Sequence, residues 1–133
     1  MMKSILALLA VSVVLACGRT DPLSECQSWA TDGSLDCRYA DLNGSELSGV
    51  DLHRVDLAGA SLEQADLADT TLTGGSLTGA NLAGANLAGA NLAGANLADT
   101  TVTDTTFTRA NLAGANLAQA ISDASTVWPT GFN

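Results

Sequence analysis

The sequence has few of the residues on which most catalytic and binding chemistry depends. Its 133 residues include one histidine, 5 lysines and arginines, 2 prolines and an aromatic fraction of 4%. The 14 acidic residues give a formal charge of −9, and there is no basic cluster, so we expect no direct contact with nucleic acid. The longest apolar run, Ile5 to Ala16, is shorter than the roughly 20 residues of a membrane-spanning helix.

No constellation of catalytic residues can be found in the sequence. His53 stands alone, no serine or cysteine has a base at a recognisable spacing, and no phosphate-binding loop is present. A metal site made of Cys26, Cys37 and the distant His53 would have poor ligand geometry. We therefore expect a protein that is not an enzyme and that has no cofactor and no metal.

A five-residue unit fills most of the chain. Its clearest form is ANLAG, which is repeated between Ala80 and Ala98, and sixteen units run in phase from Ala40 to Gln119. A repeat of this kind determines the architecture of the whole chain, so it outweighs any local sequence pattern. We expect one apolar residue of each unit to join an inward-facing column, the core ladder: Leu42, Leu47, Leu52, Leu57, Leu62, Leu67, Leu72, Leu77, Leu82, Leu87, Leu92, Leu97, Val102, Phe107, Leu112 and Leu117.

A period of five fits neither a straight helix nor a straight strand. On an α-helix, successive leucines would lie about 140° apart and spiral around the axis. On a strand, an odd period would move each next leucine to the opposite face. The leucines can share one interior only if the chain bends after every unit, which predicts an all-β coil with strand-like sides.

Alternation within the unit predicts which other positions face inward. The residue two before each leucine is small or β-branched, so it should point inward, whereas the polar residue directly before the leucine should point outward. The last residue of the unit is glycine in nine units of sixteen. Because other residues also occur there, we expect this corner not to require a positive φ. The exceptions are Arg54, Gln64, Asp69, Asp99, Asp104, Arg109 and Gln119.

The tandem pattern A-(D/N)-L-x-x resembles the pentapeptide-repeat family, over about three-fifths of the chain. The resemblance implies a right-handed, four-sided parallel β-helix with four units per coil, hence four coils and a rod roughly 19 Å tall. The family's terminal segment often looks like T-x-W-P-x-G-F, which is similar to Thr126–Phe132. Since the ends of solenoids must be covered, we expect Trp128 and Phe132 to form a C-terminal cap rather than a ligand site.

The N-terminus is typical of an export signal. Lys3 precedes the apolar run, which ends at Val14-Leu15-Ala16-Cys17. This resembles a bacterial lipoprotein signal, which implies that Cys17 is acylated and becomes the first residue after cleavage. An ordinary secretory signal is the alternative. By the same resemblance, Gly18 after the cysteine implies the outer membrane, provided that the source is Gram-negative.

The remaining cysteines suggest a stapled cap before the rod. Lipidation of Cys17 leaves Cys26 and Cys37, which export would allow to form a disulfide. The expected organisation is a signal peptide at 1–16, an acylated cysteine and tether at 17–25, an N-terminal cap segment at 26–39, the β-helix at 40–119 and a C-terminal cap at 120–133.

The function that these features favour is a membrane-tethered scaffold or protein-interaction module of the cell envelope. No charge occurs between Thr70 and Ala98, so this band is either a docking surface or a product of drift among interchangeable units. The sequence does not identify the protein partner, and it leaves self-association into a homo-oligomer open.

Two other functions are weighed against this one. Some pentapeptide-repeat proteins are thought to mimic DNA and to bind a type II topoisomerase, but export and the uncharged middle of the rod disfavour that function here. Ice binding would need stacked rows of Thr-x-Thr. Counting in steps of twenty places the three Thr-x-Thr pairs on different sides, so no row is expected; the pairs are Thr71/Thr73, Thr101/Thr103 and Thr106/Thr108.

Overall fold

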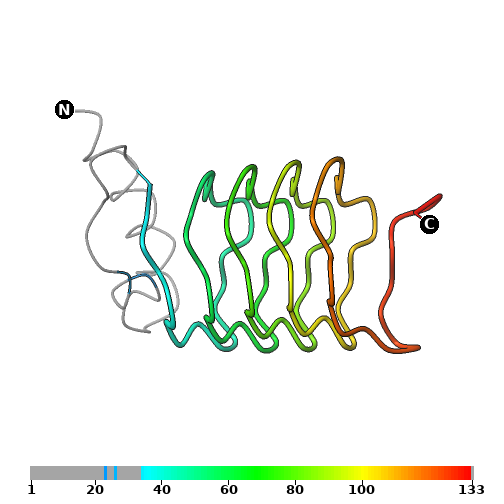
Figure 1. The fold of residues 1–133 in the computed structure, drawn as a ribbon, viewed down its shortest axis with the longest axis horizontal. Coiled ribbons are helices and arrows are strands. Elements are labelled where there is room, and N and C mark those ends of the chain that lie inside the picture. Colours follow the sequence, from blue (N-terminus) through cyan, green and yellow to red (C-terminus); the bar gives the residue numbers. More distant parts are fainter. Residues whose placement is uncertain (1–22, 24–25, 27–33, 133) are drawn as a thin grey trace.

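The protein is a rod of stacked coils, seen from the side in Figure 1. The computed structural model describes residues 23, 26 and 34–132. The predicted signal peptide and the lipidation of Cys17 lie outside the described residues and stay predictions. The chain winds from residue 34 at one end of the rod to the C-terminal segment at the other, with each coil stacked directly on the one before (Figure 1).

The stacking repeats every twenty residues, which confirms the predicted parallel β-helix with four units per coil. Among the described residues, each strand is a single residue that pairs in parallel with the residues one coil before and after it. Only the last pairing breaks the step, because Thr106 pairs with Val127. The bridges define four sides of the rod: side A holds Asp36, Asp56, Ser76, Asn96 and Asn116; side B holds Asp41, Ser61, Asn81, Thr101 and Ile121; side C holds Glu46, Asp66, Asn86, Thr106 and Val127; side D holds Asp51, Thr71, Asn91 and Asn111.

The hydrogen bonds of one unit explain why five residues suffice. In the unit Ala80–Gly84, the amides of Leu82 and Gly84 donate to the next coil, at 2.8 and 2.9 Å. The amide of Asn81 donates to the carbonyl of Ala60 in the previous coil at 2.9 Å. The amide of Ala80 donates across the corner to the carbonyl of Leu77, three residues earlier, also at 2.9 Å. Four of the five amides are therefore bonded to backbone carbonyls, and the amide after the leucine is left over.

The outward Asp or Asn binds the remaining amide. The Oδ1 atom of Asn81 accepts the N–H of Ala83 at 3.1 Å, which satisfies the fifth donor of the unit. This Asx turn is a local bond that only a short carboxamide or carboxylate makes well, so it accounts for the D/N preference before the leucine. The same bond recurs where the outward residue is Asp36, Asp41, Asp51, Asp56, Asp66, Asn86, Asn91, Asn96, Asn111 or Asn116.

The core ladder lies inside the rod, as expected from the repeat. Its members from Leu42 to Phe107 are at most 4% exposed. Each fully buried leucine contributes roughly 1.5–3 kcal/mol, so this column supplies most of the apolar stabilisation. Leu112 and Leu117 are only partly buried, because no described coil covers them.

The second inward column is lined by small side chains, and the hydroxyls of its buried threonines are all bonded. Alanine fills most of its positions, and the buried hydroxyl of Thr70 donates to the carbonyl of Leu67 at 2.7 Å. The hydroxyl of Thr105 reaches the previous coil instead and donates to the carbonyl of Leu82 at 2.8 Å. A threonine therefore replaces alanine here without leaving a buried donor unpaired.

The corner residue takes a positive φ in every unit of the repeat, so the expectation that the corner does not require it is wrong. Arg54, Gln64 and Gln119, for example, have φ values of 58°, 58° and 59°. The corner geometry is imposed by the hydrogen bonds on both sides of it, which override the cost of the left-handed conformation. The non-glycine corners are Tyr39, Arg54, Gln64, Asp69, Asp99, Asp104, Arg109 and Gln119.

A large corner side chain tends to lie over a glycine of the next coil. A Cβ atom placed on Gly59 would lie 2.6 Å from the Tyr39 ring, and one placed on Gly89 would collide with the Asp69 carboxylate. In the same way, a Cβ on Gly84 would lie 3.3 Å from the Gln64 side chain. The choice of glycine at a corner thus also depends on which side chain precedes it by twenty residues.

One additional residue shifts the last coil. Ile121 still pairs with Thr101, but Val127 rather than residue 126 pairs with Thr106. The additional residue lies in the Ser122–Ser125 turn, where Asp123 Oδ1 accepts the amides of Asp104, Ser125 and Thr126 at 3.0–3.1 Å. This shift brings Trp128 to the ladder position above Phe107.

We predict that Asn91→Ala lowers the free energy of unfolding by about 1 kcal/mol, because it leaves the Ala93 amide without its acceptor and also removes the more exposed bond that Asn111 Nδ2 donates to Asn91 Oδ1. Thr71→Ala is the matched control, since it changes the same kind of outward position one coil earlier on side D and removes no Asx bond. Chemical denaturation of both variants measures the difference. Equal losses would show that the Asx bond contributes nothing.

We predict that Gln119→Gly stabilises the protein by up to about 1 kcal/mol, because glycine adopts the left-handed corner without the steric cost of a Cβ atom. Ala118→Gly, at the neighbouring exposed position, should instead destabilise it, because that φ is not positive. Thermal unfolding of the two variants gives the signs. A destabilised Gln119→Gly variant would contradict the role given to the corner.

Candidate interaction surface

The sides of the rod are flat surfaces of short polar and methyl groups. Outward asparagines are linked from coil to coil, since Asn111 Nδ2 donates to Asn91 Oδ1 at 3.1 Å and Asn116 Nδ2 donates to Asn96 Oδ1 at 3.0 Å. Asn86 Nδ2 donates to Asp66 Oδ1 at 3.1 Å in the same way. These amides are held by their neighbours, so the sides present a fixed pattern of groups rather than mobile side chains.

Charge is distributed unevenly along the rod. The second coil, residues 56–75, carries Asp56, Glu63, Asp66 and Asp69 and no basic residue. The third coil, residues 76–95, carries no charge. The band from Thr70 to Ala98 therefore runs around the whole middle of the rod, where side chains are small, half-buried and uncharged, and it is the candidate interaction surface.

The Thr-x-Thr pairs lie on three different sides, as the step of twenty predicted. Thr71 belongs to side D, Thr101 to side B and Thr106 to side C. Their hydroxyls therefore form no continuous row along any side, and a flat threonine surface is not available.

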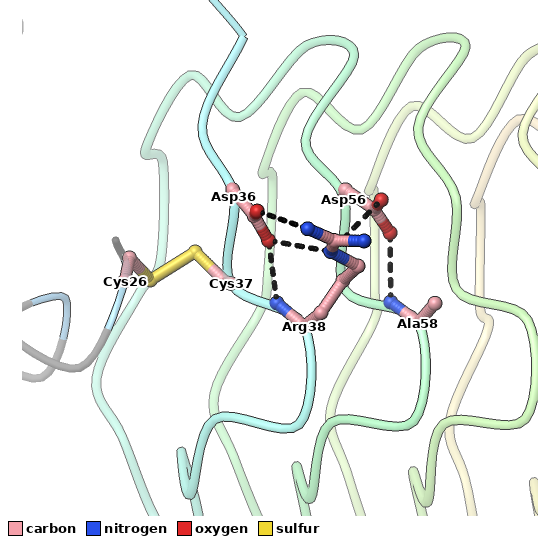
Figure 2. Close-up of a disulfide and its surroundings, with 6 residues drawn as sticks. All are labelled: Cys26, Asp36, Cys37, Arg38, Asp56 and Ala58. Carbon is pink, nitrogen blue, oxygen red and sulfur yellow. Dashed lines mark hydrogen bonds and ion pairs between the residues drawn. A yellow bond between two sulfur atoms is a disulfide. The ribbon is translucent and has the colours of Figure 1, made fainter. Parts of the chain in front are cut away.

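The N-terminal end is closed by a covalent link, shown in Figure 2. Cys37 occupies a ladder position with 1% exposure, and its amide donates to the carbonyl of Asp56 at 2.7 Å, as a leucine would. Cys26 forms a disulfide with Cys37, at an S–S distance of 2.05 Å. Leu23 and Leu35 also pack against this end of the core.

Arg38 joins the first two coils beside the disulfide, a contact that the repeat pattern did not reveal. Its guanidinium donates to both carboxylate oxygens of Asp36, at 2.9 and 2.7 Å, and lies 3.7 Å from Asp56 Oδ2 (Figure 2). Asp36 and Asp56 are consecutive members of side A. Only the pairing in steps of twenty reveals that one cation lies between them.

Hydrogen bonds shift the pKa values of three groups at the ends of the rod. Hydrogen bonds from Arg38 lower the pKa of Asp36, and Asp36 raises the pKa of Arg38. The amide of Asp104 lowers the pKa of Asp123, together with the hydroxyl of Thr126. A carboxyl group whose pKa is lower in the folded protein than in the unfolded chain stabilises the fold at pH values above its unfolded-state pKa. This stabilisation is lost as the pH falls through the folded-state pKa. Solvent screening keeps it small at exposed sites.

The C-terminal end carries an aromatic stack. Trp128 lies over Phe107 with ring centroids 5.0 Å apart, and Phe132 lies over Trp128 at 4.9 Å. Phe107 is thereby fully buried. The stack covers side C only, whereas Leu112 on side D and Leu117 on side A stay partly buried.

The described part of the chain contains no group of three or more His, Cys, Asp or Glu side chains that could hold a metal ion. Within those same ranges, no helix is long and apolar enough to span a membrane. The imidazole of His53 lies beside Asp51, with Nδ1 3.0 Å from Oδ1, and the His53 amide donates to the same oxygen at 3.1 Å.

We predict that the disulfide stabilises the first coil. Because the bond closes a short loop, Cys26→Ser should lower the free energy of unfolding by about 3 kcal/mol. Thermal unfolding with and without reductant measures this, with Cys17→Ser as a control that leaves the bond intact. Unchanged unfolding of Cys26→Ser would mean that the bond does not hold the first coil in place.

Comparison with known proteins agrees with this geometry. The family model of pentapeptide repeats matches residues 36–74, 75–112 and 85–121. A pentapeptide repeat protein of Nostoc PCC 7120, alr5209, is 36% identical with a TM-score of 0.69, over 70% of this chain and 77% of that one. A search of curated proteins found no match.

A second solved structure extends the comparison to a plant. A pentapeptide repeat protein from the thylakoid lumen of Arabidopsis thaliana is 29% identical with a TM-score of 0.50, over 63% of this chain and 62% of that one. Pentapeptide repeat proteins form right-handed quadrilateral β-helices, as predicted for this chain. The chain belongs to the pentapeptide-repeat family.

Proposed function

We propose that the protein is a non-enzymatic, membrane-tethered scaffold of the bacterial cell envelope, which binds a protein partner along its rod. The observation that carries this proposal is the hydrogen-bond pattern of the unit, in which backbone and outward Asn or Asp side chains satisfy one another. Such a rod presents a fixed shape, and its polar groups are already engaged. It is suited to presenting a surface rather than to moving protons.

The tether comes from the sequence. An apolar run that ends at Val14-Leu15-Ala16-Cys17 supports export followed by acylation of Cys17. Residues 18–25 would then join the lipid to the rod, at the end where Cys26 and Cys37 are linked. In a Gram-negative source, the protein would be held at the outer membrane.

The uncharged band from Thr70 to Ala98 is the surface that we assign to the partner. Its outward side chains are asparagine, alanine, serine and threonine, many of them half-buried, so little side-chain entropy is lost when they are covered. A partner with a flat, small-residue surface would fit this band. The acidic second coil beside it would disfavour acidic partners.

The DNA-mimic function remains the alternative, and the charge distribution disfavours it. A duplex carries regularly spaced negative charge, whereas this rod has four acidic residues in its second coil and none in its third. Assaying inhibition of a type II topoisomerase by the exported form distinguishes the two functions. We expect no inhibition, and strong inhibition would reverse the ranking.

We predict that Cys17→Ala moves the protein from the membrane fraction to the soluble fraction of cells that express it, because acylation is the only anchor we assign. Labelling with radioactive palmitate should mark the unchanged protein and leave the variant unmarked. Thr20→Ala, in the tether, is the control and should behave as the unchanged protein. An unchanged protein that stays in the soluble cytoplasmic fraction would contradict the proposal.

A further inference from the structure

The C-terminal edge of the rod has backbone donors with no acceptor among the described residues. On sides D and A, the ladder amide and the corner amide of each earlier coil donate to the next coil, as Leu92 and Gly94 do at 2.8 and 2.9 Å. The corresponding amides one coil later have no such bond: they belong to Leu112, Gly114, Leu117 and Gln119.

The same edge has free acceptors at the matching positions. The carbonyls of Ala90 and Ala95 accept the amides of Asn111 and Asn116 from the following coil, both at 2.9 Å. The carbonyls one coil later, on Ala110 and Ala115, accept no amide from the described chain. Sides D and A therefore end in the edge of a parallel ladder, with donors and acceptors in the order that another coil would satisfy.

Apolar side chains lie next to this edge. Leu112, Ala115 and Leu117 are partly buried, whereas their counterparts one coil earlier, Leu92 and Leu97, are 0% exposed. The segment Ala110–Ser122 contains no charged residue. A segment laid on this edge would thus bury two leucines and would meet no charge.

We propose that the C-terminal edge formed by Ala110–Gln119 is a strand-acceptor site, which binds an extended, uncharged segment of a partner protein in parallel. The segment that fits carries two leucine-sized side chains five residues apart, with a small residue two positions before each. Its backbone would supply acceptors to the four free amides, and its leucines would cover Leu112 and Leu117. This is recognition by strand addition, in which the ladder gives affinity and the side-chain spacing gives specificity.

A second copy of the chain added head to tail does not fit this site. The first coil would have to supply the complementary edge, but Leu23, Cys26 and Leu35 pack over that end and the Cys26–Cys37 disulfide fixes the segment there. The strand-acceptor site does not depend on the lipid anchor or on the uncharged band. The strand-acceptor proposal can therefore fail while the proposed scaffold function holds, and the scaffold function can fail while the strand-acceptor site holds.

The test uses a synthetic peptide, acetyl-ANLAGANLAG-amide, as the probe. Hydrogen exchange of the full chain, labelled with 15N, is followed by NMR with and without the peptide. We expect the amides of Leu112, Gly114, Leu117 and Gln119 to exchange at least about tenfold more slowly at saturating peptide, because each gains an acceptor and loses contact with water. The amides of Leu92 and Leu97 should not change.

Two variants test the side-chain part of the site. Leu117→Asp should weaken peptide binding by at least about tenfold, because burial of one leucine supplies a factor of that order. Ala118→Asp adds the same charge one residue later on the exposed surface and should bind as the unchanged protein does. Circular dichroism of both variants verifies that the rod is intact.

Three results would overturn the proposal. One is the absence of any slowing at millimolar peptide. Another is equal slowing by a peptide of the same composition in scrambled order, which would indicate unspecific coating of the edge. The third is slowing that grows with protein concentration without peptide, because it would mean that the edge pairs with a second copy of this chain.

Discussion

The fold depends on the bond between the outward Asp or Asn and the amide that follows the ladder leucine. A sharp bend every fifth residue leaves one amide per unit that no backbone carbonyl reaches, and a buried or half-buried amide without a partner is costly. In the central ANLAG units, that amide donates to the side chain of the outward asparagine two residues earlier. The Ala93 amide, for example, donates to Asn91 Oδ1 at 3.2 Å. The remaining features follow from this closure: the square coil, the leucine column and the fixed exterior.

Where serine or threonine replaces Asp or Asn, the closure changes. Thr73 and Thr103 lie two residues after the outward Thr71 and Thr101, and no described residue accepts their amide hydrogens. Glu63 lies two residues after the outward Ser61, and its amide donates instead to Asn43 Oδ1 of the previous coil, at 2.7 Å. The coil therefore tolerates an imperfect unit when water or a neighbouring coil can bind the donor.

The repeat predicts most of the fold, because its period alone forces a bend and a shared interior. It places the column from Leu42 to Phe107 and the step of twenty correctly. It fails at the corner, where the residues other than glycine suggested a relaxed φ, although the hydrogen bonds on both sides impose a positive φ on Arg54 and Gln119 alike. Composition at one position cannot show a strain that neighbouring bonds enforce.

The ends were harder to predict than the middle. The additional residue before Thr126 moves Trp128 onto Phe107, and no pattern of five shows an insertion of one. The position of Arg38 between Asp36 and Asp56 depends on contacts between coils in the same way. The uncharged band from Thr70 to Ala98 can be recognised in the sequence, whereas the C-terminal edge comes from the structure, since it depends on where the stacking stops.

Hydrogen exchange of the amide that follows each ladder residue tests the central claim most directly. If the outward side chain completes the unit, the amides of Ala83, Ala88 and Ala93 should exchange slowly, whereas those of Thr73 and Thr103 should exchange at rates near those of an unfolded chain. Equal exchange at all five positions would contradict the account, because the outward Asp or Asn would then not be what closes the coil.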